Sequence, residues 1–237
     1  MKTTFTMIAL MAIFTFTSCK KEADKGVITA PAVVETEAPV AEVPVFEPFQ
    51  VMAISYTVKN YDTWKKVFDE HESIRATSGL TTRAIARGTD NPNKIYLFLN
   101  VADMQKAKEY ATNPKLKEVR KTAGVTSEPE VFFSNVVRFE ESPADMKGRV
   151  RIVIKIKDFD SWVKVFDSEG KDTRASFGLI DRAIAKGVED SNMLYLTFAI
   201  SDLEKVKTYL KSPELQKLMK EAGVISKPII EYYTSVL

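Results

Sequence analysis

His71 is the only histidine of the chain, and it lies seven residues after Trp64 on the same face of a predicted amphipathic helix. An imidazole near a hydrophobic core can act as a general base, because burial and neighbouring charges tune its pKa. Arg75 follows four residues later, so the two side chains can meet in one pocket, where the like charge favours the neutral imidazole. The alternative is that His71 caps the edge of the core and bonds to the backbone or to an arginine.

The same pattern returns 98 residues later, beginning at Trp162. Counting from the tryptophan, Glu169 takes the place of His71, and Arg174 follows near the position of Arg75. Both copies therefore place an ionisable side chain at the same inward-facing position. Because the two side chains differ, we expect any catalysis to be confined to His71 and Arg75, and we treat Glu169 and Arg174 as candidate ligand-binding residues.

Two further pairs of residues are candidates for binding a ligand. Arg83 and Arg182 lie on predicted strands among alanines, and small neighbours leave room for an arginine to hold a carboxylate. The alternative is that the arginine stems pack on a sheet while the charged groups reach solvent. Tyr96 and Tyr195 could donate phenol hydrogen bonds in a cavity, or they could be core residues with satisfied hydroxyls.

Composition argues against several classes of function. The 237 residues are 45% hydrophobic and 28% charged, with a formal net charge of +2. Nucleic-acid binding needs a concentrated basic face, for which this balance gives no sign. One cysteine excludes an internal disulfide, and one cysteine with one histidine provides too few ligands for a conventional zinc site. No glycine-rich phosphate-binding motif occurs either, so we expect no cofactor and no metal.

The elements that hold these residues occur in the order β-α-β-β-α-β, and they occur twice. The first set comprises predicted strands at residues 52–58, 81–87, 95–101 and 131–137 and predicted helices at residues 60–78, 103–110 and 114–123. Marks such as Arg-Ala-Ile-Ala, Ala-Gly-Val and a helix-starting proline recur in the same order, which indicates a tandem duplication. The fold class is therefore α+β, with ferredoxin-like repeats at residues 50–138 and 150–237 and a connector at residues 139–149.

A family resemblance rests on the marks of the first repeat, which are Tyr61-Asp-Xaa-Trp64, Phe68, His71, Arg75, Gly79, Asp103, Pro114 and Gly124-Val125. In these marks the repeat resembles the dimeric α/β-barrel superfamily, which includes the antibiotic-biosynthesis monooxygenase-like domains. Two ferredoxin-like units of that superfamily join their sheets into a barrel, often as a homodimer. The resemblance implies an intramolecular barrel here, so we expect the globular part to be a monomer. It implies no single activity, since the superfamily includes oxygenases, isomerases, decarboxylases, haem proteins and binding proteins.

The N-terminus predicts export and anchoring. Lys2 precedes an apolar run from Phe5 to Phe16, which is typical of a signal peptide over residues 1–18 and too short to span a bilayer. The cysteine that follows, Cys19, resembles the acylated cysteine of a bacterial lipobox; the alternative is an ordinary signal peptide with an incidental cysteine. Residues 19–49 contain four prolines and predict an extended tether. We therefore expect a lipid-anchored envelope protein that faces the periplasm or the cell surface.

Three functions are compatible with these features. The favoured one is an envelope lipoprotein that binds a small organic ligand or a protein partner without catalysis, because the two copies share no catalytic set. The second is a cofactor-independent, monooxygenase-like or isomerase-like enzyme, with His71 as base and Arg75 or Arg83 holding an anionic substrate. The third is a haem binder with His71 as axial ligand. A pocket lined by His71, Arg75 and Arg83 would favour the enzyme, whereas a fully bonded His71 without a void beside it would count against it.

Overall fold

Eight segments rich in alternating apolar residues form β-strands in the computed structural model, which describes residues 46–236. The strands are β1 (Phe49–Thr57), β2 (Leu80–Gly88), β3 (Lys94–Val101), β4 (Glu130–Phe139), β5 (Gly148–Lys155), β6 (Leu179–Gly187), β7 (Met193–Ile200) and β8 (Ile229–Ser235). The predicted signal peptide, Cys19 and the predicted tether up to residue 45 lie outside the described residues. Phe49, assigned to the tether from the sequence, begins β1.

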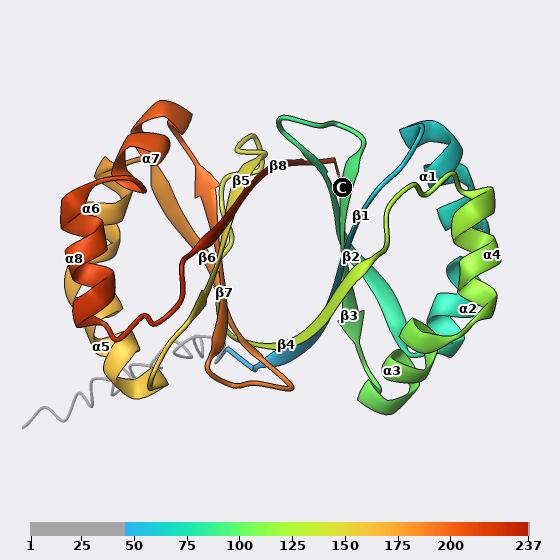
Figure 1. The fold of residues 1–237 in the computed structure, drawn as a ribbon, viewed down its shortest axis with the longest axis horizontal. Coiled ribbons are helices and arrows are strands. Elements are labelled where there is room, and N and C mark those ends of the chain that lie inside the picture. Colours follow the sequence, from blue (N-terminus) through green and yellow to red (C-terminus); the bar gives the residue numbers. More distant parts are fainter. Residues whose placement is uncertain (1–45, 237) are drawn as a thin grey trace, which may run out of the picture. The chain divides into compact units, whose positions relative to one another are not determined.

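Two helices connect β1 to β2, and two connect β3 to β4; the same holds for β5 to β6 and for β7 to β8. The helices are α1 (Tyr61–Glu70), α2 (Glu72–Thr77), α3 (Met104–Thr112), α4 (Lys115–Thr122), α5 (Phe159–Glu169), α6 (Lys171–Ser176), α7 (Leu203–Tyr209) and α8 (Pro213–Glu221). The N-terminal half, β1 to β4, and the C-terminal half, β5 to β8, each have the ferredoxin-like order predicted from the sequence. Figure 1 shows the four helices of each half on the outer face of that half's sheet, with both sheets between the helical layers.

The two sheets close into one antiparallel barrel. The strand order is β1-β3-β2-β8-β5-β7-β6-β4, so β2 pairs with β8 and β4 pairs with β6 across the two halves. The β2–β8 seam contains three register pairs, from Ala86↔Ser235 to Gly88↔Tyr233, and the β4–β6 seam contains five. The structure therefore confirms the predicted fold class, an intramolecular α/β-barrel of two ferredoxin-like units.

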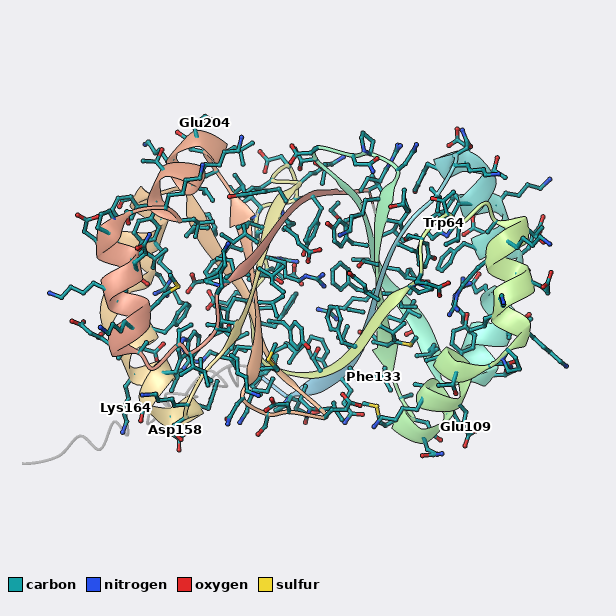
Figure 2. The ribbon with its side chains drawn as sticks, in the orientation of Figure 1. Trp64, Glu109, Phe133, Asp158, Lys164 and Glu204 are labelled. Carbon is teal, nitrogen blue, oxygen red and sulfur yellow. The ribbon has the colours of Figure 1, made fainter. Side chains whose placement is uncertain are left out.

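Each half has a hydrophobic core between its helices and its sheet. In the N-terminal half Trp64 and Phe68 of α1 are buried against the apolar side chains of β1 and β3. Asn60 caps this helix by accepting a hydrogen bond from the backbone N–H of Thr63. Trp162 of α5 occupies the corresponding place in the C-terminal half. In Figure 2 Trp64 lies beside the sheet, whereas Glu109 and Glu204 lie at the outer edges of the helical layers.

The first predicted helix is wrong in one respect. The sequence predicts a single helix over residues 60–78, but the structure has two helices, which are separated by His71 with φ −100° and ψ 16°. In the C-terminal half the break falls at Gly170, whose φ of +84° favours glycine. Because α5 is one residue longer than α1, Glu169 ends a helix, while His71 occupies the junction that Gly170 occupies in the other half.

Strand β1 is buried on both faces. Met52, Ile54 and Tyr56 pack under the helices, while Val51 and Ala53 face the interior of the barrel. Barrel closure thus turns the face of a strand that would meet solvent in an open sheet into a second interior. No helix within residues 46–236 is long and apolar enough to cross a bilayer.

Candidate functional site

The barrel holds a cavity of about 630 Å³. This volume lies in the range of small-molecule sites, which measure roughly 300–1,000 Å³. Figure 2 shows side chains from strands of both halves projecting into the interior. The aromatic part of the cavity wall comes from both halves and consists of Phe49, Phe98, Phe132, Phe139, Tyr195 and Tyr233.

Two matching bulges bring arginines to this cavity. The register of β2 against β3 shifts between Thr82 and Ala84, and the register of β6 against β7 shifts between Asp181 and Ala183. Arg83 and Arg182 are the residues at these shifts, and both line the cavity together with the neighbouring alanines. Simple alternation would place Arg83 and Ala84 on opposite faces of the strand. The bulge lets both residues line the cavity.

Arg83, Arg149 and Arg182 form what we call the arginine cluster. Arg83 donates a hydrogen bond to Asn100 (3.3 Å), and its guanidinium lies 4.2 Å from the ring centroid of Phe49. Burial lowers the pKa of Arg83 and of Arg149, and the like charge of Arg182 also lowers both. Arg182 therefore lies close enough to Arg83 and to Arg149 to act on both of them.

The connector between the halves covers this end of the cavity. Glu141 accepts a hydrogen bond from Arg182 at 2.9 Å, although the Glu141 side chain is 80% exposed. Arg149 donates to the Ser142 hydroxyl at 3.1 Å and to the backbone carbonyl of Met146. Arg83 has no carboxylate partner among the described residues, so Glu141 is the one acidic side chain that joins the arginine cluster there.

A fourth arginine of the cavity is already neutralised. Arg151 is buried and donates two hydrogen bonds to Glu231, one of them at 2.8 Å, and Lys94 adds a third at 3.1 Å. Burial alone would raise the pKa of Glu231, but Arg151 and Lys94 outweigh it and lower that pKa. Glu231 therefore stays ionised, and this carboxylate is a poor general base.

The two candidate tyrosines lie on the barrel side of β3 and β7. Tyr195 lines the cavity and stacks on Phe132 with ring centroids 4.5 Å apart. Tyr96 is buried and stacks on Tyr233 at 4.9 Å. Burial raises the pKa of Tyr96, and the carboxylate of Glu231 raises it further, so this phenol stays protonated and remains a hydrogen-bond donor.

His71 and Arg75 lie in the helix layer of the N-terminal half, away from the cavity. The His71 ring nitrogen Nδ1 is 2.8 Å from the backbone oxygen of Val67, one turn earlier in its own helix. Arg75 donates to the backbone oxygen of Phe68 and covers the Phe68 ring. Neither residue lines the cavity that Arg83 lines, so the structure does not assemble the pocket of His71, Arg75 and Arg83 considered above.

Glu169 and Arg174 lie in the helix layer of the C-terminal half. Arg174 binds Glu169 at 3.1 Å and Asp181 at 2.6 Å, and Tyr209 donates a hydrogen bond to Glu169. A small void of about 70 Å³ adjoins them, and apolar side chains form most of its lining. The candidate residues therefore fall into three places, and only Arg83, Arg182 and Tyr195 line the large cavity.

Sequence reasoning missed Arg149, Arg151 and Glu141. The first two alternate with Val150 and Ile152 on β5, and a reader expecting a closed barrel could have assigned them to its interior. Glu141 lies in the connector, where no periodicity predicts its direction. Within residues 46–236 no group of three or more His, Cys, Asp or Glu side chains is arranged to hold a metal ion.

Comparison with solved structures supports the fold. An anthrone oxidase-like protein matches with a TM-score of 0.55 and 12% identity, over 80% of this chain and 92% of its own. Proteins with provisional monooxygenase assignments from Fusobacterium nucleatum and Lactobacillus acidophilus match with TM-scores of 0.52 and 0.50 and with 10% and 13% identity. These two matches cover 80% and 79% of this chain and 93% and 94% of the other chains. No family model and no curated protein matches the sequence.

The likeness covers about as much of this chain as residues 46–236 make up, so it includes both halves. Together with the strand order, it defines a single-chain dimeric α/β-barrel with an internal cavity. At these identities the likeness extends to the fold, and the activity has to be argued from the site itself.

Proposed function

We propose that the barrel binds a small organic anion, with its carboxylate at the arginine cluster and its apolar body between the aromatic walls. The observation that carries this proposal is the charge of the cavity. Four arginines line it, and Glu141 is the one acidic residue among the described residues of the lining; with Arg151 paired to Glu231, three arginines face one glutamate, an excess of two positive charges. Glu231, which does not line the cavity, neutralises Arg151. The remaining positive charge is therefore concentrated at the arginine cluster.

The chemistry of these groups fits a carboxylate. Guanidinium groups bind carboxylates through paired hydrogen bonds, and such bonds gain strength where water is partly excluded. An anion at this end would also relieve the repulsion that lowers the pKa of Arg83 and Arg149. The aromatic rings supply the apolar contact that orients the rest of a small ligand.

Binding is favoured over catalysis by the groups that the cavity lacks. Among its described lining residues there is no histidine, aspartate or lysine, and Glu141 is largely exposed at the mouth. A monooxygenase-like or isomerase-like reaction with His71 as base would need that imidazole at the substrate, but His71 lies in the helix layer. A haem in the cavity would lack His71 as axial ligand for the same reason.

Titration calorimetry with benzoate, 2-naphthoate and the neutral analogue benzamide tests this proposal. We expect saturable, one-to-one binding of a carboxylate and at least about tenfold weaker binding of benzamide, since roughly 1.4 kcal/mol separates tenfold affinities and a charge-assisted hydrogen bond contributes that much. Arg83→Gln should weaken carboxylate binding about tenfold by the same reasoning. Equal binding of benzoate and benzamide, or no saturable binding of either acid, would contradict the proposal.

Arg87→Gln is the matched control for Arg83→Gln. Arg87 lies on the same strand but outside the cavity, where it donates to the backbone oxygen of Pro92 and covers the Tyr61 ring. We expect its loss to leave carboxylate binding unchanged. An equal effect of both variants would assign the binding to general surface charge.

We also propose that Cys19 is acylated and holds the barrel at a membrane of the cell envelope through an extended tether. The support is the position of the sole cysteine directly after the predicted signal peptide. Cys19→Ala should move the protein from the membrane fraction to the soluble fraction. Unchanged membrane fractionation of this variant would argue against the anchor.

The globular part is proposed to be a monomer. Support comes from the two seams, which close the barrel within one chain. Sedimentation of residues 44–237 should give the mass of one chain, and an obligate dimer would contradict this.

A further inference from the structure

Each half of the chain buries one arginine beneath its helices, and the two arginines share a pose. Arg75 and Arg174 are each 3% exposed. The guanidinium of Arg75 lies 3.5 Å from the ring centroid of Phe68, and that of Arg174 lies 3.7 Å from that of Phe166. In both cases Nη1 donates to the backbone oxygen of the same phenylalanine. The pose is therefore a shared feature of the two halves.

Two carboxylates complete the arrangement in the C-terminal half. Asp181 accepts hydrogen bonds from Nε and Nη2 of Arg174 at 2.8 and 2.6 Å, a bidentate pair. Glu169 accepts from Nη1 of Arg174 at 3.1 Å and from the Tyr209 hydroxyl. Burial alone would lower the pKa of Arg174, but these two carboxylates raise it. The buried cation is thus fully paired.

The N-terminal half keeps the cation but has neither carboxylate. Thr82 stands on β2 where Asp181 stands on β6, and the His71 ring bonds to its own helix. Within residues 46–236 no carboxylate is hydrogen-bonded or ion-paired to Arg75, although Glu72 and Asp69 lie close enough to raise its pKa, which burial lowers. Tyr110, the counterpart of Tyr209, has no hydrogen-bond partner there for its hydroxyl, although it lies close enough to Arg75 for each to affect the other's pKa.

The unpaired nitrogens of Arg75 remain reachable. No side-chain nitrogen of the described residues is both sealed from solvent and without a hydrogen bond, so Nε and Nη2 of Arg75 must touch solvent. These are the two atoms that Arg174 uses for its bidentate pair. Arg120 lies near Tyr110 and adds a second cation, whereas the C-terminal half has Met219 at that position.

We propose that the N-terminal half binds a small carboxylate at Arg75 and Tyr110, in the place that Asp181 and Glu169 fill in the C-terminal half. A bound carboxylate accepts two hydrogen bonds from Nε and Nη2 of Arg75 and a third from the Tyr110 hydroxyl. Because Arg75 is almost fully buried, the site admits a small acid and not the surface of a folded partner. Neither Arg75 nor Tyr110 lines the barrel cavity, although Thr82 adjoins it, and the site does not depend on the function proposed for that cavity.

Sodium acetate is the probe, with sodium chloride at equal ionic strength and neutral acetamide as controls. The readout is the Nε–H resonance of Arg75 in a ¹H–¹⁵N spectrum, assigned by its loss in Arg75→Lys. We expect a saturable shift with acetate alone. A response to acetate no greater than the response to chloride would overturn the proposal. Arg83→Gln should leave this response unchanged, so the result is independent of the barrel cavity.

Variants of the N-terminal half test the geometry. Thr82→Asp supplies an internal carboxylate to Arg75 and should weaken acetate binding at this site at least about tenfold, with a rise in melting temperature. Thr81→Asp adds the same charge at the exposed neighbouring position and should leave acetate binding intact. Tyr110→Phe removes one hydroxyl and should weaken binding about threefold to tenfold. An acetate response that survives Thr82→Asp unchanged would overturn the site.

The mirror variant Asp181→Thr should create the same site in the C-terminal half. Its Arg174 resonance should become sensitive to acetate, whereas that of the wild type should not respond. If Asp181→Thr does not fold, Asp181→Asn, which keeps the side-chain shape without the charge, serves the same purpose. An Arg174 resonance that ignores acetate in a folded variant would count against the correspondence between the halves on which the site rests.

Discussion

The buried arginines of the two halves differ in what surrounds them, although their helices and phenylalanines match. Arg174 lies among two carboxylates and a tyrosine hydroxyl, while Arg75 has a backbone oxygen and an aromatic ring. The N-terminal half therefore has the same fold without the two carboxylates that surround Arg174. In the C-terminal half, Asp181 and Glu169 neutralise Arg174 within the chain. In the N-terminal half the corresponding carboxylates are absent, which is why we propose that Arg75 binds a carboxylate ligand.

The barrel interior shows the same kind of difference. Glu231 on β8 corresponds to Phe132 on β4, so one half contributes an ion pair where the other contributes an aromatic ring. Arg151 lies against both, because it is bonded to Glu231 and its guanidinium is 4.7 Å from the ring centroid of Phe132. A ligand in the cavity therefore meets two different walls, which a symmetric homodimer could not provide.

The largest effect should come from removing the paired arginine. Arg174→Met leaves two buried carboxylates without a cation, and breaking such a pair costs roughly 3–5 kcal/mol of unfolding free energy. Arg75→Met removes a cation that has no hydrogen-bonded carboxylate and should cost about 1 kcal/mol, for the lost hydrogen bond and ring contact. Urea unfolding of both variants measures the difference. Equal losses would show that the carboxylates do not distinguish the halves.

The ion pair of Arg151 and Glu231 should produce a smaller, pH-dependent effect. The pKa of Glu231 is lowered in the folded state, so its contribution is present above the ordinary glutamate value of 4.5 and is lost as the pH falls through the folded-state pKa. Glu231→Gln should lower the unfolding free energy by about 2 kcal/mol at pH 7 and by clearly less at pH 3. Urea titrations at the two pH values provide the measurement, and a loss that is independent of pH would contradict the role of the charge.

The smallest effect should come from the helix junction. Gly170 has a φ of +84°, and a Cβ there would meet no atom within 4 Å, so any cost of Gly170→Ala arises from the backbone alone. With ψ at 149° the residue lies in a backbone region nearly confined to glycine, so we expect a loss in the lower part of the range of about 1–3 kcal/mol in unfolding free energy. His71→Ala at the corresponding junction, with φ −100°, is the control and should cost less. If Gly170→Ala unfolds at the same urea concentration as the wild type, the two junctions are equivalent in backbone strain.

The fold was predictable because its signals are local and repeated. Alternating apolar residues predicted the strands, and the duplicated order of marks predicted two ferredoxin-like units. The break at His71 was not predictable, because nothing in the run from Trp64 to Ser78 interrupts a helical pattern. The same side chains could continue one helix, but the structure separates α1 from α2, and α2 lies against β2.

The site was predicted less well, for reasons of geometry. A bulge moves a side chain to the other face of a strand. No residue next to Arg83 or Arg182 in the sequence indicates a bulge at these positions. Barrel closure also makes an interior of a face that alternation assigns to solvent, which is why Arg149 and Arg151 escaped notice. His71 was predicted on the inward face of one continuous helix, but it lies at the junction of α1 and α2, where its ring bonds to the backbone of Val67.

Strand β8 gives the barrel a particular vulnerability during synthesis. It is synthesised after the other seven strands of the barrel, and it pairs with both β2 and β5. Until it arrives, the nascent chain carries two unpaired strand edges, which are templates for pairing with other chains. A premature stop just before Ile229 would therefore yield an open, aggregation-prone sheet and not a smaller working barrel, because β8 is the strand that joins β2 to β5 and closes the wall around the cavity.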